Sequence, residues 1–293
     1  MEYRNFGNTG FSVSAIGFGA GHIGNGNADG KTFETLLNTV LDLGINLIDT
    51  ARAYGLSEKH IGRYISHRRS EFVLSTKVGY NDQLHPDWSY ETVMANVDEA
   101  LKLMRTDYLD IVHLHSCSLD TLERTEATAA LEKAREQGKV RVVAYSGENE
   151  ALRYAIDCKR FGSLQTSVNF CDQRGISDYL PDAKKTGMGV IAKRPIANAP
   201  WSHADPPVGH YSEEYWHRWK KMNPDPHGIP WDEIALRFTA FTPGVDTCIP
   251  GTSSAEHLKS GIAAFEKGPL APEIYDYLRD VFKANDKDWT GLV

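Results

Sequence analysis

Short apolar runs rich in β-branched residues alternate with longer segments of helical period along almost the whole chain. Parallel strands joined by crossover helices produce this alternation, because such strands are buried on both faces and their helices on only one. Eight runs are predicted as strands: Val13–Phe18, Asn46–Asp49, Phe72–Lys77, Asp110–His115, Arg141–Ser146, Leu164–Asn169, Gly189–Ala192 and Thr247–Ile249.

The segments between these runs space their apolar residues three and four positions apart, which predicts helices. Gly44 and Gly138 directly follow two of them, as expected for a glycine that ends a helix in the left-handed conformation. The last segment, Pro272–Lys287, has one apolar stripe and is expected as a closing helix. The other predicted helices are Thr32–Leu43, Ser57–Ser66, Tyr90–Met104, Leu119–Glu136, Glu150–Lys159, Ser177–Lys185, Trp231–Phe241 and Ala255–Phe265.

Eight strand–helix repeats favour a (β/α)8 TIM barrel over an open doubly wound sheet. An open sheet that binds a dinucleotide usually carries Gly-x-Gly-x-x-Gly after its first strand. Residues 17–21 instead have the spacing Gly-x-Gly-x-Gly, and no helix opens directly after them. We therefore expect residues 1–293 to form a single α/β barrel domain, with an N-terminal β-hairpin cap and a C-terminal closing helix.

Residues 195–230 fall outside the repeat, because prolines and tryptophans interrupt any simple period. Long loops at the carboxyl ends of barrel strands usually shape the substrate site, which is one interpretation of this long loop insert. The other is a folded insert whose aromatic side chains only pack against one another.

The 293 residues carry a formal net charge of −7, without a long run of like charge. This gives no electrostatic reason to bind nucleic acid or a membrane, so we expect a small-molecule partner; no pattern predicts the oligomeric state. A basic-then-apolar signal and a membrane-length apolar segment are both missing from the sequence, which favours a cytoplasmic protein. The cysteines fit reduced thiols, because no Cys-x-x-Cys pair occurs among Cys117, Cys158, Cys171 and Cys248.

Four polar residues lie at or just after the carboxyl ends of predicted strands, where the sites of barrel enzymes form. Asp49, Lys77 and His115 end three strands, and Tyr54 lies in the loop after the first of these. A tyrosine has a reference pKa of about 10 and becomes a useful acid when a nearby cation such as Lys77 stabilises its phenolate. Asp49 can hold that lysine charged, and His115 can hydrogen-bond a substrate oxygen.

The sequence His113-Leu114-His115 places two histidines on one strand face, which raises the alternative of a zinc hydrolase. Zinc needs further ligands from other strand ends. These ends offer a serine and a glycine at 146–147, Asn169, and a proline and a glycine at 250–251, which are poor ligands for zinc, so we predict no metal site. One of the two histidines is expected instead as an inward core group satisfied by a hydrogen bond.

The motifs that contain these residues resemble those of the aldo-keto reductase superfamily. The most specific match is NLIDTARAYG at residues 46–55, followed by STK at 75–77 and DYLDIVHLH at 107–115. The resemblance extends over nearly the whole chain, as far as IPG at 249–251. It implies a barrel oxidoreductase that moves a hydride between a nicotinamide cofactor and a small carbonyl or alcohol. In such an enzyme the tyrosine is the general acid or base, the lysine and the aspartate tune it, and the histidine orients the substrate.

The resemblance also implies a cofactor site across the mouth of the barrel. Ser146 and Gln165 correspond to the partners of the nicotinamide carboxamide, and the segment from Gly251 to the following helix corresponds to the site of the adenosine end. A phosphate there would meet free backbone amides at a helix N-terminus. The full set of expected cofactor contacts is Gly21, Ser146, Gln165, Lys193, Arg194, Pro195, Ile196, Gly251, Thr252, Ser253 and His257.

Two departures from the family pattern concern this cofactor site. Lys193 replaces the tyrosine that stacks on the nicotinamide ring, so Lys193 or Arg194 is expected to cover the ring with its stem or guanidinium, or to reach the pyrophosphate. Gly251 and His257 stand where many relatives carry a lysine and an arginine for the extra phosphate of NADP. Family precedent favours NADP(H), and NAD(H) is the alternative.

The resemblance leads to three hypotheses about the function. The first is reduction of an aldehyde, ketone or sugar with Tyr54 as the acid, and the second is an NAD(P)-dependent sugar dehydrogenase that works toward oxidation. The third, of another class, is a regulatory subunit that uses a bound cofactor as a redox sensor. His22, Trp88 and Trp201 lie in loops after predicted strands and are the expected substrate wall.

Overall fold

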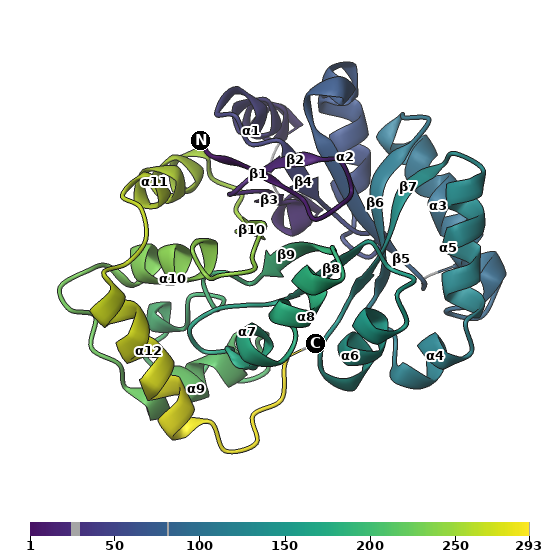
Figure 1. The fold of residues 1–293 in the computed structure, drawn as a ribbon. Coiled ribbons are helices and arrows are strands. Elements are labelled where there is room, and N and C mark those ends of the chain that lie inside the picture. The colour runs from purple at the N-terminus through teal and green to yellow at the C-terminus, as the bar shows by residue number, and fades with distance from the viewer. Residues whose placement is uncertain (25–29, 81, 293) are drawn as a thin grey trace.

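The computed structural model describes residues 1–24, 30–80 and 82–292, and its centre is one sheet of eight parallel strands. The strands follow one another in chain order, each hydrogen-bonded to the next, with helices around them (Figure 1). Their bounds are β3 (Phe18–Gly19), β4 (Leu47–Asp49), β5 (Val73–Val78), β6 (Leu109–His115), β7 (Val140–Ser146), β8 (Ser163–Ser167), β9 (Gly189–Lys193) and β10 (Thr247–Ile249).

Parallel bridges between the first and the last strand regions close this sheet into a barrel. Ile16 pairs with Cys248, and Gly19 pairs with Gly251. The Gly19 amide also donates to the Pro250 carbonyl at 3.0 Å. The predicted (β/α)8 barrel is therefore confirmed.

The first predicted strand, residues 13–18, is divided in the structure. Its start belongs to β2 (Ser12–Ser14), which pairs antiparallel with β1 (Tyr3–Asn5) in the expected N-terminal hairpin, and only Phe18 remains in the barrel strand β3. The strand is divided because the backbone of residues 12–14 is hydrogen-bonded to β1 and so is not part of the barrel sheet.

The helices surround the barrel, and two predicted ones are broken. The segment 119–136 contains two helices because Thr125 between them has a φ of 62°, and the segment 177–185 is interrupted just before Pro181. The α-helices are α1 (Gly30–Asp42), α2 (Ser57–Tyr64), α3 (Tyr90–Met104), α4 (Leu119–Glu123), α5 (Glu126–Glu136), α6 (Asn149–Asp157), α7 (Arg174–Asp178), α8 (Leu180–Lys185), α9 (Glu213–Met222), α10 (Trp231–Ala240), α11 (Ala255–Glu266) and α12 (Pro272–Asn285). The 3-10 helices are η1 (Ala20–Gly24), η2 (Ser66–Glu71) and η3 (Pro200–Ser202).

The interior of the barrel is filled from one end by the hairpin. Phe6 and Val13 are fully buried and pack with inward side chains of the strands, among them Leu47 and Ile191. A Cβ added to Gly189 would come within 2.5 Å of the Phe6 ring, so this glycine leaves room for that ring. The hairpin thus covers the amino-terminal end of the strands and leaves the carboxyl end for a site.

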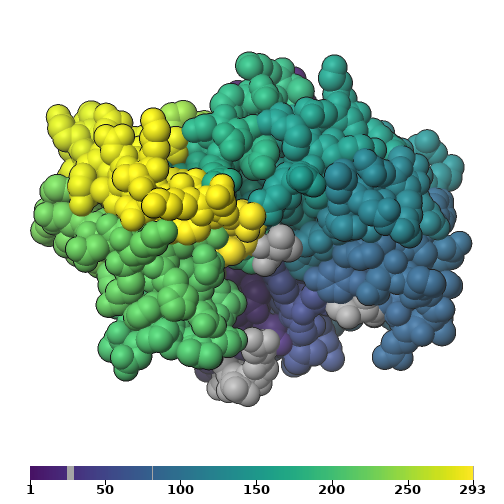
Figure 2. Space-filling model, turned by 90° about the horizontal axis from the view of Figure 1, so that it is seen from below, coloured from purple at the N-terminus to yellow at the C-terminus, as the bar shows by residue number. Residues whose placement is uncertain are grey.

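The insert 195–230 is folded and contains η3 and α9, which the sequence did not predict. It lies beside α10 and α12 (Figure 1). Side chains of these elements form a second apolar cluster that includes Phe170, Tyr215 and Phe282. After α12 the chain turns back, and its last described residues lie across one face of the molecule, in yellow between the green insert and the teal central segments (Figure 2). No helix in the described ranges combines the length and the apolar character needed to cross a membrane.

Candidate active site

The motif at residues 49–58 forms a loop that is fixed to the neighbouring strand β5. The Thr50 amide donates to the Ser75 carbonyl at 2.8 Å, and the Arg52 amide donates to the Lys77 carbonyl at 3.1 Å. The hydroxyl of Thr50 donates to that of Ser57 at 2.8 Å, which ties the loop to the start of α2. These bonds hold the loop that carries the predicted acid.

Glu58 is the buried anchor of the same loop. Its carboxylate pairs with Arg52 and accepts a hydrogen bond of 2.7 Å from the Thr76 hydroxyl. Burial raises the pKa of Glu58, while Arg52 and Thr76 act in the opposite direction. The motif therefore contains its own ion pair, whose role is to position the loop.

Lys77 and Asp49 form a buried ion pair at the mouth of the barrel. Each side chain is 2% exposed, and the Nζ atom lies 2.6 Å from Asp49 Oδ2. Nζ also donates to the Thr50 carbonyl at 2.8 Å, and the Ser75 hydroxyl donates to Asp49 Oδ1 at 2.8 Å. Burial lowers the pKa of Lys77, but the charge of Asp49 and the contact with Tyr54 outweigh it, so the net shift is upward. Lys77 is therefore a charged lysine.

The Tyr54 ring lies against this cation. Lys77 Nζ is 4.8 Å from the ring centroid, and the His115 ring meets the Tyr54 ring edge-on at a centroid distance of 5.9 Å. A Cβ added to Gly21 would be 3.7 Å from the same ring, so Gly21 lies beside the tyrosine. The structure thus brings together all four residues predicted at the strand ends.

His115 is held by a tyrosine that the sequence analysis did not single out. The Tyr80 hydroxyl is 2.7 Å from His115 Nδ1, and the two rings stack at 5.2 Å. Burial, followed by the charges of Lys77 and Lys193, lowers the pKa of His115 to about 2, so the imidazole is neutral. The available signal for Tyr80 was its place three residues after Lys77, in the loop at a strand end.

Trp88 and Trp201 occupy different surroundings. Trp88 packs against Tyr80 at a ring distance of 5.3 Å, which connects it to the His115 side of the site. Trp201 stacks with Phe170 and Trp231 at 6.0 and 6.1 Å and belongs to the cluster beneath the insert. Contacts with the site therefore favour Trp88 over Trp201 as substrate wall.

His113, the other histidine of the pair, is fully buried inside the barrel. Neither ring nitrogen has a hydrogen-bond partner of normal geometry among the described residues, so the expected hydrogen bond is missing there. Burial lowers the pKa of His113 to about 4, which leaves it neutral. Within the same described ranges, no three His, Cys, Asp or Glu side chains come close enough to hold a metal ion.

Ser146 and Gln165 are neighbours at the ends of β7 and β8. They lie opposite each other in the strand register, and the Ser146 hydroxyl donates to Gln165 Oε1 at 3.0 Å. The other amide atom, Gln165 Nε2, is buried without a partner among the described residues. A buried N–H donor without a partner is costly, and an amide oxygen of a ligand would satisfy it. These residues fit a nicotinamide carboxamide.

Lys193 and Arg194 point to different partners. Lys193 Nζ is 3.2 Å from Oε1 of Glu148, a buried carboxylate that the sequence analysis did not include. The Arg194 guanidinium donates to the Ser167 hydroxyl at 3.3 Å and to the Leu292 carbonyl in the C-terminal tail. The next two predicted contacts, Pro195 and Ile196, continue this chain away from the barrel and pack beside α10, where the Thr239 hydroxyl donates to the Pro195 carbonyl at 3.0 Å.

The segment after β10 forms a capped helix start. The Thr252 hydroxyl lies 3.5 Å from His257 Nδ1, and Ser253 is exposed just before α11. A Cβ added to Gly251 would come within 2.7 Å of the His22 ring, so His22 borders this segment. His22 is therefore placed beside the expected cofactor site, although the sequence predicts it as substrate wall.

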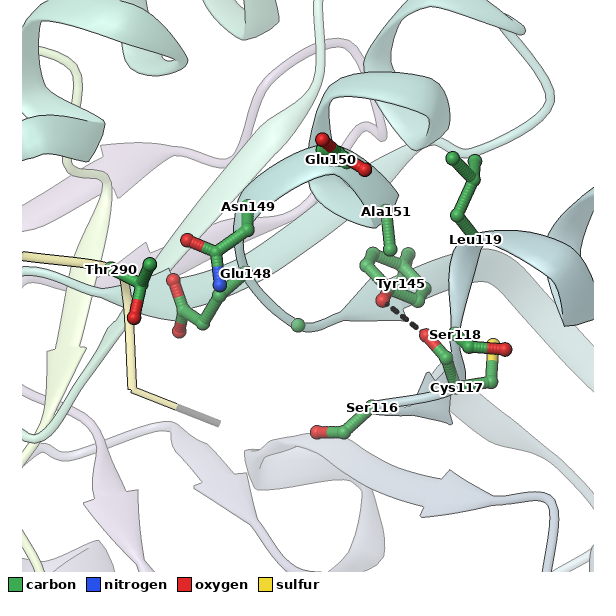
Figure 3. Close-up of a pocket in the computed structure, with 11 residues that line it drawn as sticks. Ser116, Cys117, Ser118, Leu119, Tyr145, Glu148, Asn149, Glu150, Ala151 and Thr290 are labelled. Atoms are coloured by element: carbon green, nitrogen blue, oxygen red, sulfur yellow. Dashed lines mark hydrogen bonds between the residues drawn. The ribbon is translucent and has the colours of Figure 1, made fainter. Parts of the chain in front are cut away.

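A cavity of about 410 Å³ opens directly after His115, between the loops that follow β6 and β7. Ser116, Tyr145, Glu148 and Asn149 line it, together with Thr290 of the tail (Figure 3). The four strand-end residues are not among those that line it, so this cavity lies between the loops after β6 and β7 and the tail.

A parallel barrel with a lysine–carboxylate pair under a tyrosine at its mouth is the arrangement expected of a barrel oxidoreductase, and comparisons identify the family. The model of the Aldo/keto reductase family matches residues 15–283, so the chain belongs to that family. L-galactose dehydrogenase of Arabidopsis thaliana is 29% identical over 282 residues, which cover 90% of this chain and 88% of the relative. L-glyceraldehyde 3-phosphate reductase of Escherichia coli (strain K12) is 30% identical over 67% of this chain and 62% of its own.

A solved structure gives the same result for the fold. The holo form of aldo-keto reductase AKR11C1 from Bacillus halodurans superposes with a TM-score of 0.85 at 26% identity and covers 98% of both chains. The chain is thus an oxidoreductase of this family, and nicotinamide cofactors are the cofactors of the family.

Proposed function

We propose that this protein transfers a hydride between NAD(P)(H) and the carbonyl carbon of a small aldehyde, ketone or sugar, with Tyr54 as the general acid or base. The observation that carries the proposal is the buried Lys77–Asp49 pair, whose cation lies 4.8 Å from the Tyr54 ring. A charge at this place stabilises the phenolate that remains when Tyr54 gives up its proton. The four free thiols fit the cytoplasm that the sequence favours.

In this proposal Tyr54 delivers the proton, and Lys77 and His115 assist it. Tyr54 donates its hydroxyl proton to the carbonyl oxygen, and Lys77, kept charged by Asp49, offsets the negative charge left on the ring. Neutral His115 donates a hydrogen bond to the same oxygen when its Nδ1 accepts from the Tyr80 hydroxyl, because the proton of the ring is then on Nε2. In the oxidative direction the Tyr54 phenolate takes the proton back.

The cofactor, when bound, supplies or accepts the hydride. Ser146 and Gln165 would hold its carboxamide, since Gln165 Nε2 is a buried donor without a partner in the described chain. The N-terminal amides of α11, with Thr252 and His257 beside them, would hold the phosphate at the other end. We keep NADP(H) as the preferred cofactor, with NAD(H) as the alternative.

The test is a Tyr54→Phe variant compared with Tyr3→Phe, which removes an exposed phenol from the hairpin at the opposite end of the barrel. Tyr54→Phe should lower kcat at least about a hundredfold, the usual loss for a general acid, and leave the Kd for NADPH within twofold. Tyr3→Phe should change neither. Carbonyl reduction at the normal rate by Tyr54→Phe would refute the assignment of the acid.

A second candidate is sugar oxidation, which the likeness to L-galactose dehydrogenase over 90% of this chain supports. Initial rates with a panel of aldoses and NAD⁺ or NADP⁺, set against aldehydes and ketones with NADPH, separate the two directions. If cofactor binds but no substrate in either panel turns over, a regulatory role as a redox-sensing subunit becomes the better explanation.

A further inference from the structure

Two buried groups of opposite charge meet beside the expected nicotinamide site. Glu148 follows Ser146 and Gly147 in the loop after β7, and Lys193 is the last residue of β9. Their side chains are 3% and 13% exposed, and Lys193 Nζ lies 3.2 Å from Glu148 Oε1. Lys193 replaces the stacking tyrosine of the family pattern, and Glu148 is the partner of its ammonium group.

The Glu148 carboxylate is held in place by several donors. Oε1 accepts from the Ser167 amide at 2.8 Å, and Oε2 accepts from the Thr166 hydroxyl at 2.5 Å. Glu148 is also the residue just before α6, yet its side chain makes no capping hydrogen bond to that helix. A carboxylate at a helix start usually accepts from the helix amides, so its turn toward β8 and β9 serves the lysine instead.

The lysine of this pair is the last residue of a barrel strand. In the register of the sheet, Lys193 lies opposite Ser167 and Ile249 at the rim of the barrel. Its charge contributes to lowering the pKa of the catalytic-site residue His115, although burial is the larger cause. Figure 3 shows the Glu148 carboxyl group on the side of the loop that faces the C-terminal tail. Burial lowers the pKa of Lys193, and the charge of Glu148 opposes that shift, so the carboxylate is what favours the ammonium form; the charge of Lys77 also acts on Lys193, which places it near the mouth of the barrel.

We propose that Lys193, held by Glu148, forms a charged wall of the nicotinamide site that makes the protein bind reduced cofactor in preference to oxidised cofactor. The ring of NAD(P)⁺ is a cation and that of NAD(P)H is neutral, so a fixed ammonium beside the ring disfavours only the oxidised form. An aromatic wall, in contrast, attracts a cation. This inference rests on the proposed function and adds to it a source of discrimination between the two redox states.

The test compares dissociation constants, which require no turnover. The Kd values of NADPH and NADP⁺ are measured by calorimetry for the wild type, Lys193→Met and Lys193→Arg. The ratio of the Kd for NADP⁺ to that for NADPH should fall about tenfold in Lys193→Met, mainly through tighter NADP⁺ binding, and stay within twofold of wild type in Lys193→Arg. Lys184→Met, which removes a lysine paired with Asp246 at 2.7 Å beside the start of β9, at the other end of the strand from Lys193, should also keep the wild-type ratio.

Glu148→Gln tests the partner, because it removes the negative charge and keeps a similar shape. The ratio should rise in this variant, since the cation is no longer offset. If Lys193→Met fails to fold, the double variant Glu148→Gln with Lys193→Met, which buries no unpaired charge, takes its place and should show the same fall. An unchanged ratio in the folded lysine variant, with NADPH still bound, would overturn the inference. Absence of nicotinamide binding by the wild type would instead refute the proposed function.

Discussion

Removing one member of the Lys77–Asp49 pair should destabilise the fold more than removing both. Both side chains are 2% exposed, so Asp49→Asn leaves a buried ammonium that keeps the Thr50 carbonyl and the Tyr54 ring but no negative charge of a carboxylate. Lys77→Met leaves a buried carboxylate that retains the Ser75 hydroxyl. An unpaired buried charge costs about 3–5 kcal/mol, a large part of the roughly 5–15 kcal/mol that stabilises a typical domain.

The double variant Lys77→Met with Asp49→Asn contains neither charge and should lose much less than the sum of the two single losses. We expect a coupling free energy of about 2–3 kcal/mol or more. Urea unfolding at neutral pH, followed by circular dichroism, gives the free energy of unfolding for each variant. Arg124 and Asp120 provide the control cycle, because both are 70% exposed and an exposed pair contributes less than about 1 kcal/mol.

Two results would contradict this reasoning. Losses below about 1 kcal/mol in both single variants would mean that water reaches the pair and screens it. A coupling energy equal to that of the control cycle would mean that the two charges do not depend on each other. Either result would also remove the electrostatic support for Tyr54, because Lys77 is the cation against its ring.

Three further predictions concern the surroundings of the site and the opposite end of the barrel. Tyr80→Phe removes the bond of 2.7 Å to His115 and should lower kcat/KM about tenfold with the Kd for NADPH unchanged; an unchanged kcat/KM in steady-state kinetics would exclude this orienting role. Burial, followed by the charge of Glu148, raises the pKa of Asp172 to about 7, against about 3.9 in an unfolded chain. Between these values the folded state keeps a proton that the unfolded state has lost, so stability should fall as pH rises through this window, and Asp172→Asn should flatten the fall in Tm. Phe6→Ala should cost about 3–5 kcal/mol in urea unfolding yet leave the Kd for NADPH unchanged, because the ring plugs the far end of the barrel.

Much of the fold could be predicted because each barrel strand is a local pattern. Strands such as β6 and β7 are apolar on both faces, so a short stretch of sequence is enough to recognise them. The error at residues 13–18 came from pairing with a strand seven to eleven residues earlier, which periodicity does not contain. The break at Thr125 depends on one left-handed residue inside a pattern that otherwise remains helical.

The site divides in the same way between local motifs and contacts across strands. The structure assembles Asp49, Tyr54, Lys77 and His115 because each lies at or near the carboxyl end of a barrel strand, and the barrel brings those ends together. Glu148 was missed because its importance depends on Lys193, which lies 45 positions later in the sequence and on another strand. A buried ion pair of this kind becomes visible only when the topology is known.

Neighbouring residues at the end of β9 illustrate how one departure from a family pattern can produce two different contacts. Lys193 keeps the extended conformation of the strand and extends toward Glu148. Arg194 has a φ of 55°, which turns the next side chain out of the strand alternation and toward the Leu292 carbonyl of the tail. The tail is thereby tied to the same strand end that carries the charged wall. A dinucleotide phosphate that used Arg194 would share its guanidinium with this carbonyl, whereas one held at the start of α11 would not, so the contacts favour the second arrangement.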